Sequence, residues 1–194
     1  NKNITIFNSS ILPLKNTTNL LVASRGWFGN IRSWDGVNFV ILTLLNSKYK
    51  KIKQNIIDID LDILKNINLK FKELKKKIIL HEKVSLEGPE DPRLYYFNGN
   101  IYMLFNELDY KSLDDKKKPK RLMFIVEIDV NILNYKSNKL LLCKLNSTKF
   151  EKNWGPFTYK KNLYMLYDIN PLKILKVNNN NNCEFVINKN NKYI

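Results

Sequence analysis

The sequence predicts an all-β fold of the β-propeller class, in which sheets of four strands surround a common axis. Two observations support this prediction. Short apolar runs separated by turn residues recur along a chain of 194 residues that is 44% apolar and 12% aromatic, which is the pattern of many short strands. In addition, one hairpin pattern is repeated at a spacing of about 62 residues, and a fixed spacing of this size is typical of repeat architectures.

The most distinct hairpin lies between residues 94 and 106. Its first strand is predicted at Leu94–Phe97 and its second at Ile101–Asn106, with an Asn98-Gly99 turn between them. Asn-Gly between two apolar runs is the strongest short-range hairpin signal. This hairpin is therefore the reference with which the rest of the chain is compared.

The same pattern returns later in the chain. A strand is predicted at Phe157–Tyr159, a turn at Lys160-Lys161-Asn162 and a second strand at Leu163–Asp168. Within it, Tyr164-Met165-Leu166-Tyr167 matches Tyr102-Met103-Leu104-Phe105. We interpret the two segments as equivalent parts of successive modules.

A looser match and further strands complete the modules. The apolar run Phe39–Leu42 follows an Asp35-Gly36 turn, and β-rich segments lie at 121–129, 139–144, 173–177 and 183–187. Four strands per module is the composition of a propeller blade. We expect one domain over residues 1–194, with about three blades at approximately 19–85, 86–148 and 149–194. The segment Ile56–Lys77 is interpreted as outer strands of the first blade, with a lysine-rich helix as the alternative.

The competing fold is a β-sandwich, which also has many short strands between turns. The internal repeat favours the propeller. Closed propellers typically have about four to eight blades, so three modules predict an incomplete ring, as in a fragment, a truncated product or a subunit that borrows strands. Unpaired strand edges in such a chain would favour self-association.

The charge balance is strongly basic, with a formal net charge of +15. Clustered lysines can bind phosphate backbones, but here the lysine excess accompanies many Asn and Ile residues, as expected for an AT-rich genome such as that of a large virus or a protist. We therefore interpret the lysines as solvated loop and edge charges and expect no nucleic-acid partner. A basic protein that binds anionic surfaces is kept as a third alternative.

No apolar run is long enough to cross a bilayer and no signal peptide is recognised near the N-terminus, so we expect no membrane association and favour a cytoplasmic location. Cys143 and Cys183 lack CxxC spacing and lie in apolar surroundings, which predicts buried free thiols. No metal-ligand cluster, phosphate-binding glycine loop or dinucleotide fingerprint is found. We expect neither a metal nor an organic cofactor.

The scarce Arg, Trp and Gly residues gather in three stretches, at 24–36, 88–99 and 151–157. Each lies just before or on a first strand, and first strands of all blades surround the axial opening of a propeller. We therefore expect the three stretches to converge. Guanidinium forks, indole faces and closely approachable backbone suit a polar, ring-shaped ligand.

The richest stretch is Gly88-Pro89-Glu90-Asp91-Pro92-Arg93. Two adjacent carboxylates on an extended chain point to opposite sides, so one can face a ligand while the other pairs with an arginine. A carboxylic acid can promote glycosidic cleavage by protonating the leaving oxygen. The alternative is that Glu90, Asp91 and Arg93 only form a salt-bridged corner.

The stretch Gly88–Arg93 resembles the Gly-x-Glu-Asp-Pro-Arg signature of the β-mannoside phosphorylase and hydrolase family. The stretches Glu151–Phe157 and Tyr167–Pro171 resemble the motif of the next blade in relatives of that family, and Arg25 resembles the arginine of the preceding blade. The resemblance extends over about residues 19–177.

The resemblance implies a five-bladed propeller that acts on β-mannosides or related glycosides by phosphorolysis, hydrolysis or sugar transfer. It implies Asp91 as the catalytic general acid, acting through a substrate hydroxyl, and inorganic phosphate as a candidate co-substrate. A non-catalytic carbohydrate-binding propeller is the alternative. The predicted substrate-binding residues are Arg25, Asp35, Glu90, Arg93, Asn153, Trp154 and Asp168.

Overall fold

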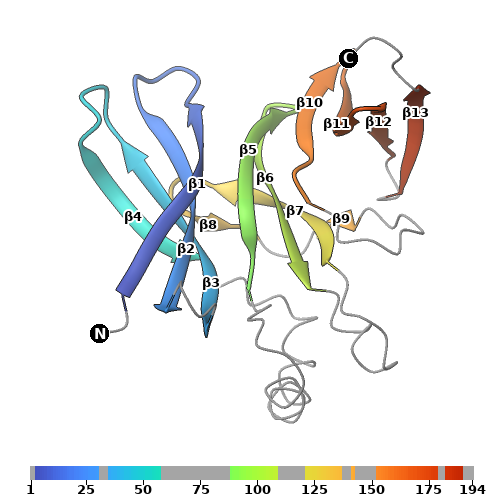
Figure 1. The fold of residues 1–194 in the computed structure, drawn as a ribbon. Helices are drawn as coiled ribbons and strands as arrows, with labels where there is room; N and C mark the ends of the chain where they lie inside the picture. The colour runs from blue at the N-terminus through green and yellow to red at the C-terminus, as the bar shows by residue number, and fades with distance from the viewer. Residues whose placement is uncertain are drawn as a thin grey trace.

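A computed structural model describes residues 3–30, 35–57, 88–108, 121–136, 141–142, 152–178 and 182–189. These residues form strands and turns, and the strands gather into three antiparallel sheets (Figure 1). The all-β prediction is confirmed. Within these ranges the structure has no helix of the length and hydropathy that a membrane span needs.

The first sheet takes in the N-terminal residues, which the predicted first module leaves out. Its second and third strands pair over their whole length, so that Asn30 lies opposite Asp35 and Gly29 opposite Gly36. The prediction of a turn at Asp35-Gly36 is therefore wrong, because continued pairing with the preceding strand overrides the local turn signal. The strands lie in the order β1 (Asn3–Pro13), β2 (Leu20–Asn30), β3 (Asp35–Leu45) and β4 (Lys51–Ile57).

The second and third sheets follow the sequence prediction closely. The second contains β5 (Glu90–Phe97), β6 (Asn100–Leu108), β7 (Arg121–Asp129) and β8 (Asn134–Tyr135), and β9 (Leu141–Leu142) also pairs with β7. The third contains β10 (Gly155–Tyr159), β11 (Asn162–Ile169), β12 (Leu172–Val177) and β13 (Cys183–Lys189). Most of the segment interpreted as outer strands, beyond Ile57, lies outside the described residues.

The repeated hairpin has the same turn geometry in both sheets. Asn98 and Gly99 have φ of 47° and 83°, and Lys160 and Lys161 have φ of 45° and 63°. Two consecutive left-handed residues are the mark of a type I′ turn, whose twist matches that of the flanking strands. The twist of the strands therefore requires the same left-handed backbone conformation at Lys160-Lys161 as at Asn98-Gly99, although lysine adopts positive φ less readily than glycine or asparagine.

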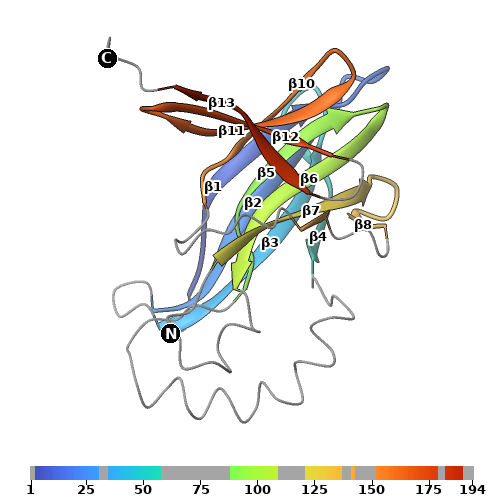
Figure 2. The ribbon, with the colours of Figure 1, turned by 90° about the vertical axis from the view of Figure 1, so that its right-hand side faces the viewer.

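The first strands of the three sheets lie side by side. In Figures 1 and 2, β5 runs next to β1, and β10 contacts β5 on its other side. One core, with Leu42 and Phe105, fills the space between the first two sheets, and a second, with Leu104 and Met165, lies between the second and third. Because β6 sends alternate side chains into different cores, the second sheet is covered on both faces. The described residues form successive sheets and no closed ring.

The structure corrects the prediction of free thiols. Cys183, at the start of β13, is disulfide-bonded, whereas Cys143 lies outside the described residues. The prediction failed because it relied on close spacing, and disulfides also join cysteines that are distant in the sequence.

Gly88 and Gly99 provide a matched test of the fold. Both have positive φ, of 88° and 83°, but a Cβ on Gly88 would lie 2.0 Å from the carbonyl oxygen of Asn38, whereas a Cβ on Gly99 would meet nothing within 4 Å. We expect Gly99→Ala to lower the free energy of unfolding by about 1 kcal/mol, from backbone strain alone. Gly88→Ala should cost more than about 2 kcal/mol, because backbone must also move. Urea unfolding followed by circular dichroism would measure both; equal losses would contradict the close approach.

Candidate functional site

The segment that leads into β5 has an unusual backbone. Gly88 adopts φ of 88° and Asp91 adopts φ of 51°. The pairing of β5 with β6 shifts register between Glu90 and Arg93, which marks a bulge. This bulge changes the direction of the two carboxylates. The sequence predicted that they would point to opposite sides, but both contact the guanidinium of Arg25, because a residue in the left-handed region breaks the alternation of a strand.

Glu90 connects the first two sheets. Its Oε1 forms ion pairs with Nη2 of Arg25 and with Nη2 of Arg121, both at 2.8 Å, and accepts a hydrogen bond from Nδ2 of Asn38 at 3.1 Å. Arg25 and Asn38 belong to the first sheet and Arg121 to the second. The side chains of Glu90, Arg25 and Arg121 are 16%, 10% and 5% exposed. Such charge-assisted bonds are strong where little water competes.

Asp91 lies beside this pair with one oxygen fixed. Its Oδ1 accepts Nη1 of Arg25 at 3.2 Å and Nδ2 of Asn8 at 2.6 Å. Its Oδ2 makes no hydrogen bond within the described part of the chain, and the side chain is 13% exposed. The carboxylate is therefore held in a set direction while one oxygen is left to meet another molecule.

Both arginines are held by asparagines as well as by carboxylates. Nε of Arg25 donates to Oδ1 of Asn38 at 2.7 Å, and the ring of Phe7 lies 4.9 Å from the guanidinium carbon. Nη1 of Arg121 donates to Oδ1 of Asn106 at 2.9 Å. The guanidinium planes are thus fixed from several sides. Among the described residues, two guanidinium groups face two carboxylates, so these four formal charges cancel.

Sequence reasoning missed several members of this cluster. Asn8, Asn38 and Asn106 could not be singled out, because asparagine is abundant throughout the chain. Arg121 did carry a signal, since it is one of few arginines. It was passed over because it lies outside the three stretches in which the scarce residues gather.

The structure brings together Arg25, Glu90 and Asp91, whereas Trp154, Asn153 and Asp168 lie elsewhere. Trp154 is 1% exposed and packs in the core between the second and third sheets, with its ring 5.3 Å from that of Tyr167. Asn153 is exposed just before β10 and has φ of 63°. Asp168, near the end of β11, lies 3.9 Å from Nζ of Lys173. The substrate-binding roles predicted for these residues stay predictions.

The remaining two predicted residues lie on strands. Arg93 follows the bulge in β5, and its side chain makes no hydrogen bond or ion pair within the described residues. Asp35 begins β3, where its backbone lies opposite Asn30. The side chain of Asp35 lies outside what the structure describes. Arg93 does not join the described contacts around Glu90, so the alternative in which Glu90, Asp91 and Arg93 form a single corner is not what these contacts show.

The pKa values of two groups outside this cluster, Tyr95 and Lys136, are raised. Burial, with a smaller contribution from Tyr102, raises the pKa of Tyr95 above its usual value, so this phenol stays neutral between the second and third sheets. A hydrogen bond to Glu127 raises the pKa of Lys136. The Glu127–Lys136 pair is on the surface, with the lysine side chain 50% exposed, and is therefore a useful comparison for the buried ion pairs.

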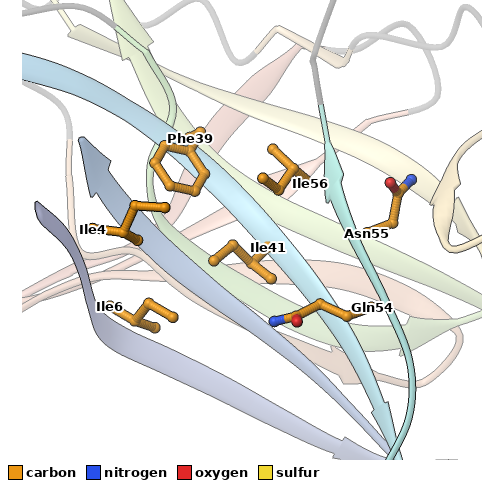
Figure 3. A pocket seen from close by; sticks show the side chains of 7 residues that line it. All are labelled: Ile4, Ile6, Phe39, Ile41, Gln54, Asn55 and Ile56. Carbon is orange, nitrogen blue, oxygen red and sulfur yellow. The ribbon is translucent and has the colours of Figure 1, made fainter. Parts of the chain in front are cut away.

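A hollow of about 480 Å³ lies on the first sheet (Figure 3), and neither Glu90 nor Asp91 is among the residues that line it. Its lining is mostly aliphatic and contains no charged side chain, so it lacks groups for acid–base chemistry. It is lined by Ile4, Ile6, Phe39, Ile41, Gln54, Asn55 and Ile56.

Comparison with known proteins identifies curated relatives that share one name. No family model matches the chain. The chain is 27% identical over 163 residues to β-mannosyltransferase 2 of Komagataella phaffii, in strain GS115 and in strain CBS 7435. The matched region covers 80% of this chain but 22% of the relative. The chain therefore spans about a fifth of the length of the curated relatives it matches.

The role of Glu90 in joining the sheets can be tested with a neutral isostere. Glu90→Gln removes the charge that faces Arg25 and Arg121, which leaves two buried guanidiniums without their shared anion. We expect the free energy of unfolding to fall by about 2–4 kcal/mol. Glu127→Gln, which disrupts an exposed pair, should have a much smaller effect. Denaturant unfolding of both variants measures the difference, and equal losses would mean that the Glu90 contacts do not stabilise the fold.

Proposed function

We propose that this chain forms part of an enzyme that acts on β-mannosides, with Asp91 as its general acid. The observation that carries the proposal is the Asp91 carboxylate, which is fixed through Oδ1 by Asn8 and Arg25 and has Oδ2 without a hydrogen bond in the described residues. A general acid needs this combination of a set direction and one accessible oxygen. The likeness to a protein named a β-mannosyltransferase supports the mannosidic substrate.

The name of the relative favours transfer to a sugar acceptor. Phosphorolysis would require cationic groups for the incoming phosphate. The guanidiniums of Arg25 and Arg121 already face Glu90, whereas Arg93 has no hydrogen bond or ion pair within the described residues and keeps phosphate as the second candidate. We therefore place transfer before phosphorolysis and hydrolysis.

We also propose that the three sheets are successive blades of a propeller. Their first strands lie next to one another, and each sheet has an Asn or Asp in the left-handed region on its first strand or just before it. These residues are Asn8, Asp91 and Asn153, with φ of 50°, 51° and 63°. First strands that lie side by side are expected when the sheets are arranged alike around one opening.

The proposed acid is tested by Asp91→Asn, which keeps the shape of the side chain and removes its acidic proton. The purified chain is incubated with β-mannosides and mannose-containing oligosaccharides, with and without phosphate or a sugar acceptor. Mannose, mannose 1-phosphate and transfer products are then quantified. We expect Asp91→Asn to lower kcat by about 100-fold to 10,000-fold. Asp129→Asn, at the far end of β7 where the carboxylate accepts a turn N–H, should leave kcat unchanged.

Unchanged turnover in Asp91→Asn would overturn the proposed role. A folded chain that binds the oligosaccharides but forms no product would instead support the carbohydrate-binding module. Isothermal titration calorimetry with the same oligosaccharides distinguishes binding without turnover from no binding at all.

A further inference from the structure

Asn8 makes the shortest hydrogen bond that Asp91 receives. Its Nδ2 lies 2.6 Å from Oδ1 of Asp91, whereas Nη1 of Arg25 lies at 3.2 Å. Asn8 belongs to β1, in the first sheet, and reaches across to β5 in the second. Its amide and the guanidinium of Arg25 are therefore both contributions of the first sheet to the direction of the Asp91 carboxylate.

The backbone around Asn8 is built to hold this position. Asn8 has φ of 50°, and the pairing of β1 with β2 shifts register between Phe7 and Ser10. The two serines that follow Asn8 anchor the bulge. Ser9 and Ser24 share a hydroxyl hydrogen bond of 2.8 Å, and Oγ of Ser10 accepts the backbone N–H of Leu94 at 2.9 Å. The bulge is thus tied to β2 and β5, which limits the places that the amide can reach.

The two donors determine which oxygen of Asp91 can carry a proton. An amide N–H and a guanidinium N–H both point at Oδ1, and each needs an oxygen lone pair. A proton on Oδ1 would remove a lone pair and oppose the donors, whereas Oδ2 has no such donor in the described residues. Among the described residues, the charged side chain that contacts the Asp91 carboxylate is that of Arg25.

We propose that Asn8 is a positioning residue that places the transferable proton of Asp91 on Oδ2. The inference rests on the proposed function. In cleavage, Oδ2 gives its proton to the leaving oxygen, the bond between the mannosyl carbon and that oxygen breaks, and the leaving group departs as an alcohol. The mannosyl carbon bonds to the acceptor oxygen, the proton of the acceptor hydroxyl passes to water, and Asp91 regains a proton from water. Asn8 itself touches no substrate in this scheme and acts only through Asp91.

Two substitutions remove the donor without disturbing the backbone. Asn8→Gly keeps the left-handed conformation and deletes the amide. Asn8→Asp keeps the size and puts an acceptor oxygen where the donor was, so it should repel Oδ1. Asn16→Gly is the control, because Asn16 also has a left-handed backbone, with φ of 62°, but lies on the exposed turn between β1 and β2.

The readout is the dependence of kcat on the leaving group. A p-nitrophenyl β-mannoside loses a stable phenolate and needs little acid assistance, whereas a methyl β-mannoside must be protonated as it leaves. The purified chain is incubated with each mannoside, and the consumption of that mannoside is measured, whichever acceptor takes the mannosyl group. We expect Asn8→Gly to lower kcat for the methyl mannoside by about 10-fold to 100-fold with KM nearly unchanged. The loss for the nitrophenyl mannoside should be less than about 3-fold, and Asn8→Asp should lose more than Asn8→Gly.

Equal losses of kcat for the methyl and the p-nitrophenyl mannoside would overturn the inference, because a merely structural role of Asn8 would lower both alike. Wild-type kcat in Asn8→Asp would overturn it as well. Asp91→Asn, measured with the same two mannosides, distinguishes a failure of the proposed function from a failure of the role of Asn8. If it leaves methyl mannoside turnover unchanged, the proposed function fails; if it abolishes that turnover while the Asn8 variants keep theirs, only the role of Asn8 fails.

Discussion

Two arginines from different sheets meet on one carboxylate oxygen of Glu90, and the geometry around the candidate site depends on this meeting. Removing charged groups from water is costly, and their mutual attraction offsets that cost only when the remaining donors and acceptors are also satisfied. Asn38 and Asn106 supply these remaining partners. The network is therefore less a source of net stability than a strict condition on how the first two sheets pack.

The packing of the first two sheets around Glu90 also determines the conformation of the backbone at Asp91. The approach of Gly88 to the carbonyl of Asn38 brings the start of β5 against the first sheet. With Glu90 fixed in place, the bulge that follows turns Asp91 toward Arg25 as well. Apolar cores on both faces of the second sheet keep β5 from shifting. A single oxygen of Asp91 is left outside these constraints, and the chemistry proposed for the site requires only that oxygen.

The sequence was sufficient to predict strands and their pairing where a short turn joins two apolar runs. The β5–β6 and β10–β11 hairpins were found because a short turn between apolar runs determines its own pairing, and β7 was predicted with its observed bounds. It was insufficient where the local turn signal is weak or misleading. β1 was not recognised, although it pairs with β2, the next strand in the chain, and Asp35-Gly36 resembled a turn although it continues the pairing with β2. The convergence of Glu90 and Asp91 on Arg25 depends on a bulge that no alternation rule predicts, whereas the importance of the stretch itself was predicted from its rare residues.

The position of Glu90 has a consequence for how such sequences are interpreted. Because the acidic pair and its arginine partner help to join the sheets, a descendant that lost its activity would still be under selection to keep most of the stretch from Gly88 onward. Its glycine, glutamate and arginine partners would persist as architecture. The residues that best distinguish an active copy from an inactive one are then those that contribute least to folding. In this stretch they are Arg93, whose side chain makes no hydrogen bond or ion pair within the described residues, and Asp91, of which one oxygen, Oδ1, contacts the first sheet.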